Sequence, residues 1–159
     1  MELPFLEYRV ATPLDMDEIV NLWKEIQRYH EELDPRYSMV DDAAFLARSY
    51  YSERMDMADN IFFVATLEKQ LIGFVFAYLQ KKPPVYRDLD MGFIDTLMVT
   101  TRYRRSGIGS HLVDLVKQWL IDQGIHRLQL SVASMNQIGI AFWERCGFKE
   151  LSRRMESDI

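Results

Sequence analysis

The first part of the chain combines a short apolar run with an amphipathic helical pattern. Tyr8–Ala11 predicts a short strand. Thr12 and Pro13 predict the start of a helix, because threonine caps first turns and proline suits the first helical position, while Asp15 suits the positive helix end. Apolar residues then follow near helical spacing until Pro35, and they give this helix one apolar face: Ile19, Leu22, Trp23, Ile26 and Leu33.

The middle of the chain predicts a second helix and then a hairpin. The helical stretch follows Asp41 and Asp42, and one of its sides carries three residues: Phe45, Leu46 and Ser49. Two β-rich runs come next, Ile61–Leu67 and Leu71–Leu79, joined by three polar residues. Runs of this composition with so short a connection predict an antiparallel hairpin, which ends at Lys81–Pro84.

The second half alternates strands with helices. Gly92–Val99 predicts a strand, and Ser110–Gln123 predicts a helix whose buried stripe has five members: Leu112, Leu115, Val116, Trp119 and Leu120. Apolar and polar residues alternate over 128–132, which indicates another strand. Gln137–Cys146 predicts the last helix, ended by a glycine, and Phe148–Leu151 predicts the beginning of a closing strand.

The element order is therefore β-α-α-β-β-β-α-β-α-β. Hairpin strands come first and crossover helices later, so we expect an α/β fold with one mixed sheet, antiparallel in its first half and parallel where a helix links consecutive strands. The 159 residues suit a single domain, 1–159, with a substantial core.

Composition and charge narrow the classes of partner. Hydrophobic residues make up 48% and charged residues 27% of the chain, which is typical of a folded protein. The net charge of −5 disfavours nucleic acid as a partner, and no apolar run is long enough for a membrane span. The N-terminus carries acids where a signal peptide is basic, and the one cysteine, Cys146, forms no internal disulfide, so we expect a cytoplasmic protein. The three histidines lack metal-ligand spacing, so we expect no metal site.

A glycine-containing loop between a strand and a helix carries the strongest chemical signal. It comprises Arg104, Arg105, Ser106, Gly107, Ile108, Gly109 and Ser110. The first N–H groups of a helix lack internal partners and carry a partial positive charge, so this arrangement favours an anion. Gly107 and Gly109 let the main chain approach phosphate oxygens, and Arg104 and Arg105 add charge and forked donors. The loop therefore favours a pyrophosphate.

Two common pyrophosphate motifs do not fit this loop. The dinucleotide fingerprint requires glycine or alanine where Leu112 stands and an acid near Gln129, and the Gly-Lys-Ser/Thr triplet of a P-loop is absent from the sequence. The segment Arg104-x-x-Gly107-x-Gly109 instead resembles the Arg/Gln-x-x-Gly-x-Gly/Ala loop of the Gcn5-related N-acetyltransferase family. Asn136, the run Ala141–Phe148 with its aromatic pair and Gly-Phe, and the element order resemble the same family, so the resemblance covers nearly the whole chain.

The resemblance implies acetyl-CoA as co-substrate, bound where the fourth and fifth strands separate. Main-chain groups of Leu97, Met98 and Val99 would pair with the pantetheine arm like an added strand. The N–H groups of residues 105–110 would hold the pyrophosphate, Asn136 would bind the pantetheine, and Trp143 would line the thiol end.

The implied reaction is attack by a free amine on the thioester, which needs a base, because a lysine-like amine has a pKa of about 10.4. Asp95, four residues before Val99, is the candidate base, and the Val99 N–H is the candidate oxyanion donor. Trp143 stands where many family members carry a tyrosine that protonates the thiolate, and indole is no useful acid. Tyr78 is a possible substitute.

The acceptor is expected near the first two helices and the loop before the fourth strand. Acids gather there and favour a cationic small-molecule amine, although they equally suit a solvated face: Glu31, Glu32, Asp34, Asp41, Asp42, Asp88 and Asp90. A protein or peptide acceptor, and a non-catalytic acyl-CoA sensor permitted by Trp143, remain open alternatives. The resemblance also suggests a possible homodimer.

Overall fold

The computed structural model of the protein describes residues 5–81, 83, 85 and 90–159. The sequence predictions that involve residues 1–4, Lys82, Pro84 and Asp88 therefore lie outside the described residues. In the part of the chain that the structure describes, every helix falls short of the length and apolar character that a bilayer crossing needs.

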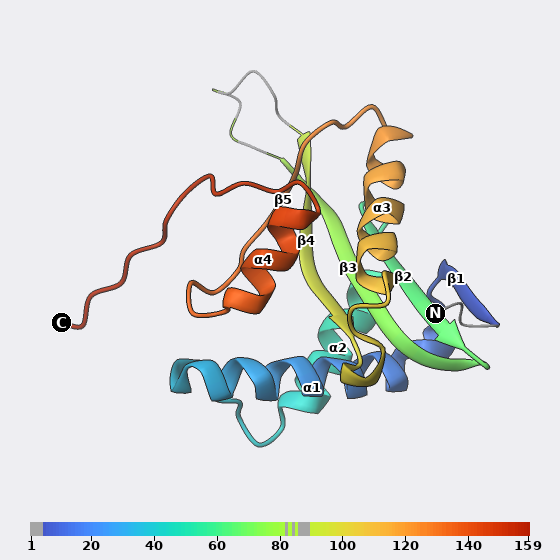
Figure 1. The fold of residues 1–159 in the computed structure, drawn as a ribbon, viewed down its shortest axis with the longest axis horizontal. Helices are drawn as coiled ribbons and strands as arrows, with labels where there is room; N and C mark the ends of the chain where they lie inside the picture. The colour runs from blue at the N-terminus through green and yellow to red at the C-terminus, as the bar shows by residue number, and fades with distance from the viewer. Residues whose placement is uncertain (1–4, 82, 84, 86–89) are drawn as a thin grey trace.

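One five-stranded sheet organises the molecule (Figure 1). Its strands follow chain order across the sheet: β1 Leu6–Val10, β2 Asn60–Leu67, β3 Gln70–Lys81, β4 Asp90–Val99 and β5 Leu128–Leu130. The first four pair antiparallel, whereas β4 and β5 pair parallel through a helical crossover. The predicted mixed sheet, antiparallel first and parallel later, is confirmed.

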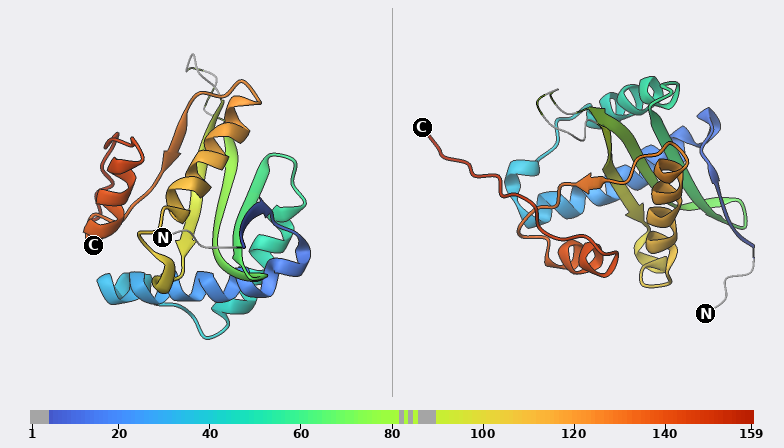
Figure 2. Two further views of the ribbon diagram at one scale, coloured as in Figure 1. Left: turned by 45° about the vertical axis from the view of Figure 1, so that its right-hand side comes forward. Right: turned by 90° about the horizontal axis from the view of Figure 1, so that it is seen from above.

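Helices cover both faces of this sheet (Figure 2). α1 (Met16–Leu33) and α2 (Ala43–Met55) share a core with Phe74 and Phe76 of β3. On the opposite face α3 (Ile108–Ile121) buries Val75 and Ala77 of the same strand, and α4 (Gln137–Arg145) packs at the edge of that second core. Because adjacent β3 side chains point to opposite faces, one strand supports both cores. Three short 3-10 helices complete the described elements: Pro13–Asp15, Pro35–Tyr37 and Thr101–Tyr103.

The structure corrects two details of the sequence prediction. Phe45 is 68% exposed and Leu46 49% exposed, whereas Ala47 and Tyr51 form the buried side of α2. The apolar residues of α2 lie on all of its sides, so periodicity could not identify the buried one.

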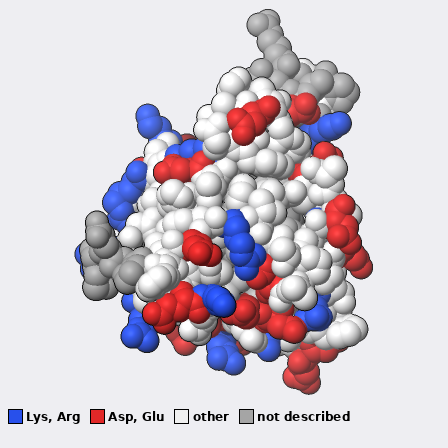
Figure 3. Space-filling view, turned by 90° about the vertical axis from the view of Figure 1, so that its right-hand side faces the viewer, with Lys and Arg blue, Asp and Glu red and all other residues white. Residues whose placement is uncertain are grey.

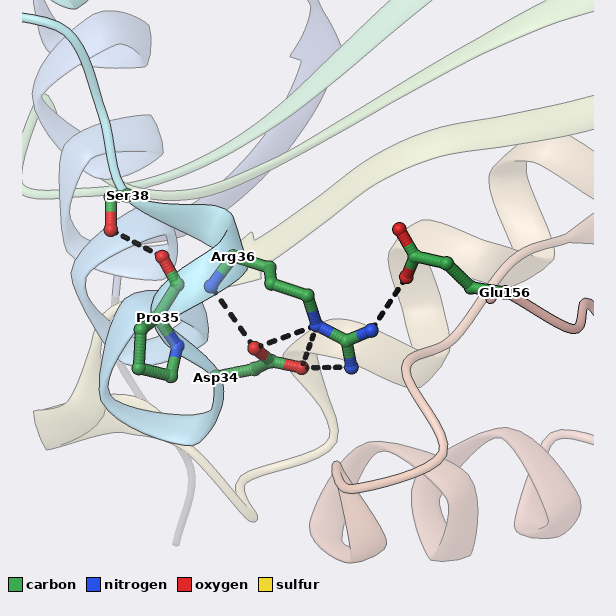
Figure 4. A network of polar contacts seen from close by, with 5 residues as sticks. All are labelled: Asp34, Pro35, Arg36, Ser38 and Glu156. Atoms are coloured by element: carbon green, nitrogen blue, oxygen red, sulfur yellow. Dashed lines mark hydrogen bonds and ion pairs between the residues drawn. The ribbon is translucent and has the colours of Figure 1, made fainter. Parts of the chain in front are cut away.

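The predicted closing strand over Phe148–Leu151 is wrong. Gly147 adopts a left-handed conformation (φ 90°), and the Phe148 N–H donates to the Trp143 carbonyl at 3.0 Å. This glycine-capped helix end uses the main-chain donor with which the strand would begin. The remaining residues form an extended tail without helix or strand, and Arg36 of the second 3-10 helix binds Asp34 and, at 2.5 Å, Glu156 of this tail (Figure 4).

A buried carboxylate joins β1 to the start of α1. Both oxygens of Asp15 accept hydrogen bonds from the Arg9 guanidinium at 2.7 Å, and the Thr12 N–H donates to one of them at 2.7 Å. The Asp15 side chain is only 8% exposed, so these bonds are poorly screened by water. The Arg9 guanidinium, assisted by Thr12, lowers the pKa of Asp15 to about 2.

We expect Asp15→Asn to lower the free energy of unfolding by about 2 kcal/mol near neutral pH. A carboxylate whose pKa is lower in the folded than in the unfolded state stabilises above its unfolded pKa, and this contribution is lost as pH falls through the folded value. The difference between wild type and variant should therefore vanish between about pH 4 and about pH 2. Urea unfolding at a series of pH values measures it, and a constant difference over that window would contradict the assignment.

Candidate active site

An extra residue in β4 marks the centre of the site. Phe76 of β3 pairs with Thr96, whereas the next residue, Ala77, pairs with Ile94, so Asp95 has no opposite partner in β3. This is a β-bulge, which bends a strand and re-aims a side chain. The strand pattern in the sequence predicts β4 but contains no signal for the bulge.

The same point in β4 is where its other neighbour ends. β5 pairs with β4 only through Gly92, Phe93 and Ile94, so the β5 side of β4 is unpaired from Asp95 onward in the described structure. The Thr100 N–H donates to the Ile72 carbonyl at 2.9 Å. Since bonded and non-bonded pairs alternate along an antiparallel ladder, Met98 faces β3 while Leu97 and Val99 turn their main-chain groups to the unpaired side.

Arg104 binds the C-terminal end of β4. Its Nε donates to the Val99 carbonyl at 3.1 Å, and its Nη2 lies 3.9 Å from the Met98 sulfur. The guanidinium therefore folds back onto β4, whereas the sequence analysis assigned its charge to the phosphate site. In this position Arg104 links the glycine loop to the unpaired edge of the strand.

The loop that follows has a row of unused main-chain donors. Arg105 (φ 63°) and Gly107 (φ 88°) are left-handed, and α3 begins at Ile108, two residues earlier than predicted. No side chain caps α3, and from Arg105 through Ser110 no main-chain N–H donates to another described group. An uncapped helix N-terminus with exposed N–H groups suits an anion.

Glycine is required at the two loop positions, 107 and 109, for different structural reasons. A Cβ at Gly107 would meet no atom within 4 Å, so its positive φ is the constraint there. A Cβ at Gly109 would lie 3.3 Å from the Phe142 ring, so this glycine lets α3 approach α4. Of the two glycines, only Gly107 has open space around the position of its missing Cβ.

Asn136 caps α4 and is tied to α1. Its Oδ1 accepts hydrogen bonds from the Gly139 N–H at 2.8 Å and from the Tyr29 hydroxyl at 3.2 Å. The side chain is buried, and its Nδ2 donates to no described group. A Cβ at Gly139 would lie 2.5 Å from that Nδ2, so the glycine makes room for the amide. Sequence reasoning missed Tyr29, because the two residues are 107 positions apart.

Trp143 belongs to an aromatic cluster on α4. Its ring makes edge contacts with Phe142 and Phe148, with centroid distances of 4.9 and 5.4 Å. It is half-buried at the border of the second core.

Asp95 lies at the surface among aromatic side chains. Thr96 Oγ1 donates to its Oδ2 at 2.9 Å, the Tyr50 hydroxyl lies 3.4 Å from its Oδ1, and the buried Tyr51 hydroxyl lies 3.0 Å from Thr96 Oγ1. Desolvation by the surrounding protein raises the pKa of Asp95, and the bonds from Thr96 and Tyr50 and the charge of Arg54 offset this only in part. A raised pKa makes this carboxylate a stronger base than an ordinary aspartate.

Tyr78 lies on β3 in the same neighbourhood. Its ring contacts Phe76 and Phe93, with centroids 5.9 and 5.5 Å away, and no described residue accepts a hydrogen bond from its hydroxyl. Burial, followed by the negative charge of Asp95, raises its pKa, so the phenol remains protonated at neutral pH.

A groove of about 260 Å³ lies between α1 and the segment after β4, lined by Glu25, Arg28, Tyr29, Glu32, Thr101 and Arg104. Of the predicted acceptor acids, Glu32 lines this groove, Asp34 is engaged by Arg36, and the other described ones are exposed. One face of the molecule shows both charge signs interspersed (Figure 3). The described residues hold no group of acids, histidines and cysteine suited to a metal.

The chain resembles known proteins over most of its length. A family model described as the acetyltransferase (GNAT) family matches residues 19–148. The human N-acetyltransferase 8 is 30% identical over 113 residues, which is 71% of this chain and 47% of that protein. The chain thus spans about half the length of the curated relatives that it matches.

Solved structures share the fold at lower identity. A mutant of the BH1408 protein from Bacillus halodurans superposes with a TM-score of 0.88 at 18% identity, covering 96% of this chain and 99% of that chain. A predicted acetyltransferase with acetyl-CoA from Clostridium acetobutylicum has a TM-score of 0.80 at 19% identity, covering 96% of both chains. With the family match over residues 19–148 and the sheet described above, the chain belongs to the acetyltransferase (GNAT) family.

Proposed function

We propose that the protein transfers an acetyl group from acetyl-CoA to a primary amine of a small molecule, by direct attack in a ternary complex. The observation that carries the proposal is the adjacency of two sets of main-chain groups. The β4 edge has no partner strand after Asp95, and the N–H groups at the start of α3 have no acceptor among the described residues. The acetyl-CoA named for the Clostridium acetobutylicum structure supports the choice of co-substrate.

The chain offers three kinds of group to acetyl-CoA. Leu97 presents its main-chain groups, and Val99 its N–H, on the unpaired side of β4, where the pantetheine arm can add like a strand. The Val99 carbonyl is already bound by Arg104. The N–H groups of residues 105–110 face no described acceptor and suit the pyrophosphate. Asn136 has its oxygen engaged by Tyr29 and Gly139, so its Nδ2 is the part left to donate to the pantetheine.

Asp95 is the residue that we assign as base. Its carboxylate is accessible, its pKa is raised, and Thr96 fixes its orientation through Oδ2. The Val99 N–H, on the unpaired side of the same strand, is the donor that we assign to the developing oxyanion.

The leaving thiolate needs no strong acid, because a thiol of pKa about 8.5 leaves fairly well unprotonated. Trp143 packs among α4 aromatics and supplies no such proton. Tyr78, protonated and near Asp95, is the phenol that we assign to this role.

The second candidate function is a sensor that binds acyl-CoA without turnover. The absence of a tyrosine at position 143 favours it. Thiol release with a panel of amines separates the two functions.

We predict that Gly107→Ala weakens acetyl-CoA affinity by up to about fivefold, because the left-handed conformation that aims the loop N–H groups is strained for alanine by about 1 kcal/mol. Gly124→Ala is the matched control. Gly124 is also left-handed (φ 73°), with no atom within 4 Å of an added Cβ, but lies just beyond the other end of α3.

Thermal unfolding should show similar destabilisation in both glycine variants. Calorimetric titration with acetyl-CoA should show weakened binding only in Gly107→Ala. Equal affinity in the two variants would remove the loop from the binding site. Absence of binding heat in the folded wild-type protein would remove acetyl-CoA itself.

We predict that Asp95→Asn lowers kcat roughly 100-fold or more while leaving acetyl-CoA affinity nearly unchanged, because the amide cannot accept the proton of the attacking amine. The acid limb of the wild-type pH–rate profile should lie above the ordinary aspartate range, since activity is lost as pH falls through the raised pKa of Asp95.

Thr96→Val tests the same assignment without removing the carboxylate. Loss of the hydroxyl that donates to Oδ2 removes a contribution that lowers the pKa of Asp95, so the acid limb should move to higher pH. Unchanged turnover in Asp95→Asn would exclude this residue as the base.

A further inference from the structure

We propose that the acceptor carries a carboxylate close to its nucleophilic amine, as an amino acid does, and that Arg54 of α2 binds this carboxylate while Asp95 receives the amine. The proposal rests on the proposed transferase function and names the substrate class of the same site.

Arg54 is held at the site but its charge is not neutralised. Its Cζ lies 3.4 Å from the centroid of the Tyr50 ring, and its Nη1 donates to the Tyr50 carbonyl at 3.2 Å. These contacts fix a half-buried guanidinium in the last turn of α2. Among the described residues no carboxylate forms an ion pair with Arg54, so forked donors remain for a ligand.

Asp95 and Arg54 carry opposite charges and both lie next to Tyr50, but they form no ion pair. The face of the Tyr50 ring carries the guanidinium, whereas its hydroxyl lies 3.4 Å from Asp95 Oδ1. One phenol therefore separates two opposite charges that still influence each other, since the charge of Arg54 lowers the pKa of Asp95.

A ligand with both charges satisfies both groups together. Its carboxylate takes the forked donors of Arg54, and its ammonium binds Asp95, which then accepts the proton that makes the amine nucleophilic. Tyr50 and Tyr78 provide aromatic surface beside this path, and both are electrostatically coupled to Asp95 and Arg54.

A purely cationic acceptor fits this arrangement poorly. A diamine would place its second ammonium beside an arginine whose charge no described carboxylate neutralises, and like charges at close range repel. The acids that suggest a polyamine in the sequence lie elsewhere: Glu32 lines the groove beside α1, and Asp34 is bound by Arg36. The residues around Asp95 thus select for charge on both ends of the acceptor.

The test compares amines that differ only by the carboxylate. Thiol release from saturating acetyl-CoA is measured with lysine against cadaverine and with phenylalanine against phenethylamine, using the intact protein. The wild-type protein should show kcat/KM at least about tenfold higher for the carboxylate-bearing member of each pair, as expected for one charge-assisted contact.

Arg54→Met should abolish this preference, and Arg54→Lys should retain part of it. Arg48→Met is the matched control on the same helix, because Arg48 pairs with Asp17 and should leave the preference unchanged. Acetyl-CoA affinity and thermal unfolding, measured for each variant, show that the protein remains folded.

A wild-type preference for the decarboxylated amines, or an equal loss with both members in Arg54→Met, would overturn the inference and leave the transferase function standing. Thiol release with none of the amines, while acetyl-CoA still binds, would overturn the transferase function and the inference with it.

Discussion

Main-chain hydrogen bonding is the constraint on which the site depends. A strand in the interior of a sheet has donors and acceptors on two sides, and each must find a partner. The bulge at Asp95 interrupts this for β4, because one extra residue bends the strand where its pairing with β5 ends. The result is a strand that pairs with β3 on both sides of the bulge but, in the described part of the chain, has no neighbouring strand on its β5 side after Asp95.

The surrounding elements stabilise that open edge without closing it. Arg104 satisfies the Val99 carbonyl at the end of β4, and the loop that carries it leads into an uncapped helix. Two cores, one on each face of the sheet, hold the strand in place: Met98 lies in the core beneath α1 and α2, while Ile94 lies in the core beneath α3. Buried packing on both faces of the sheet therefore holds β4 in place, although its β5 side has no partner strand after Asp95 among the described elements.

Local patterns in the sequence were sufficient for the helices, the hairpin and the glycine loop. They were insufficient wherever a contact depended on the fold. The apolar pattern of β4 contains no signal for the bulge. The sequence around Phe148 predicts a strand, but in the fold the Phe148 N–H caps α4. Tyr29, Tyr50 and Arg54 reach the site from α1 and α2, so their roles appear only once the helices are packed on the sheet.

Gly139 has a consequence for anyone who engineers this protein. Alanine in place of a helical glycine ordinarily raises stability by up to about 1 kcal/mol, which makes such positions attractive for thermostabilisation. Here the added methyl group would take the space of the Asn136 amide, whose oxygen joins α1 to α4. A routine stabilising exchange at this position would instead displace the side chain that forms the Tyr29–Asn136 hydrogen bond between α1 and the start of α4.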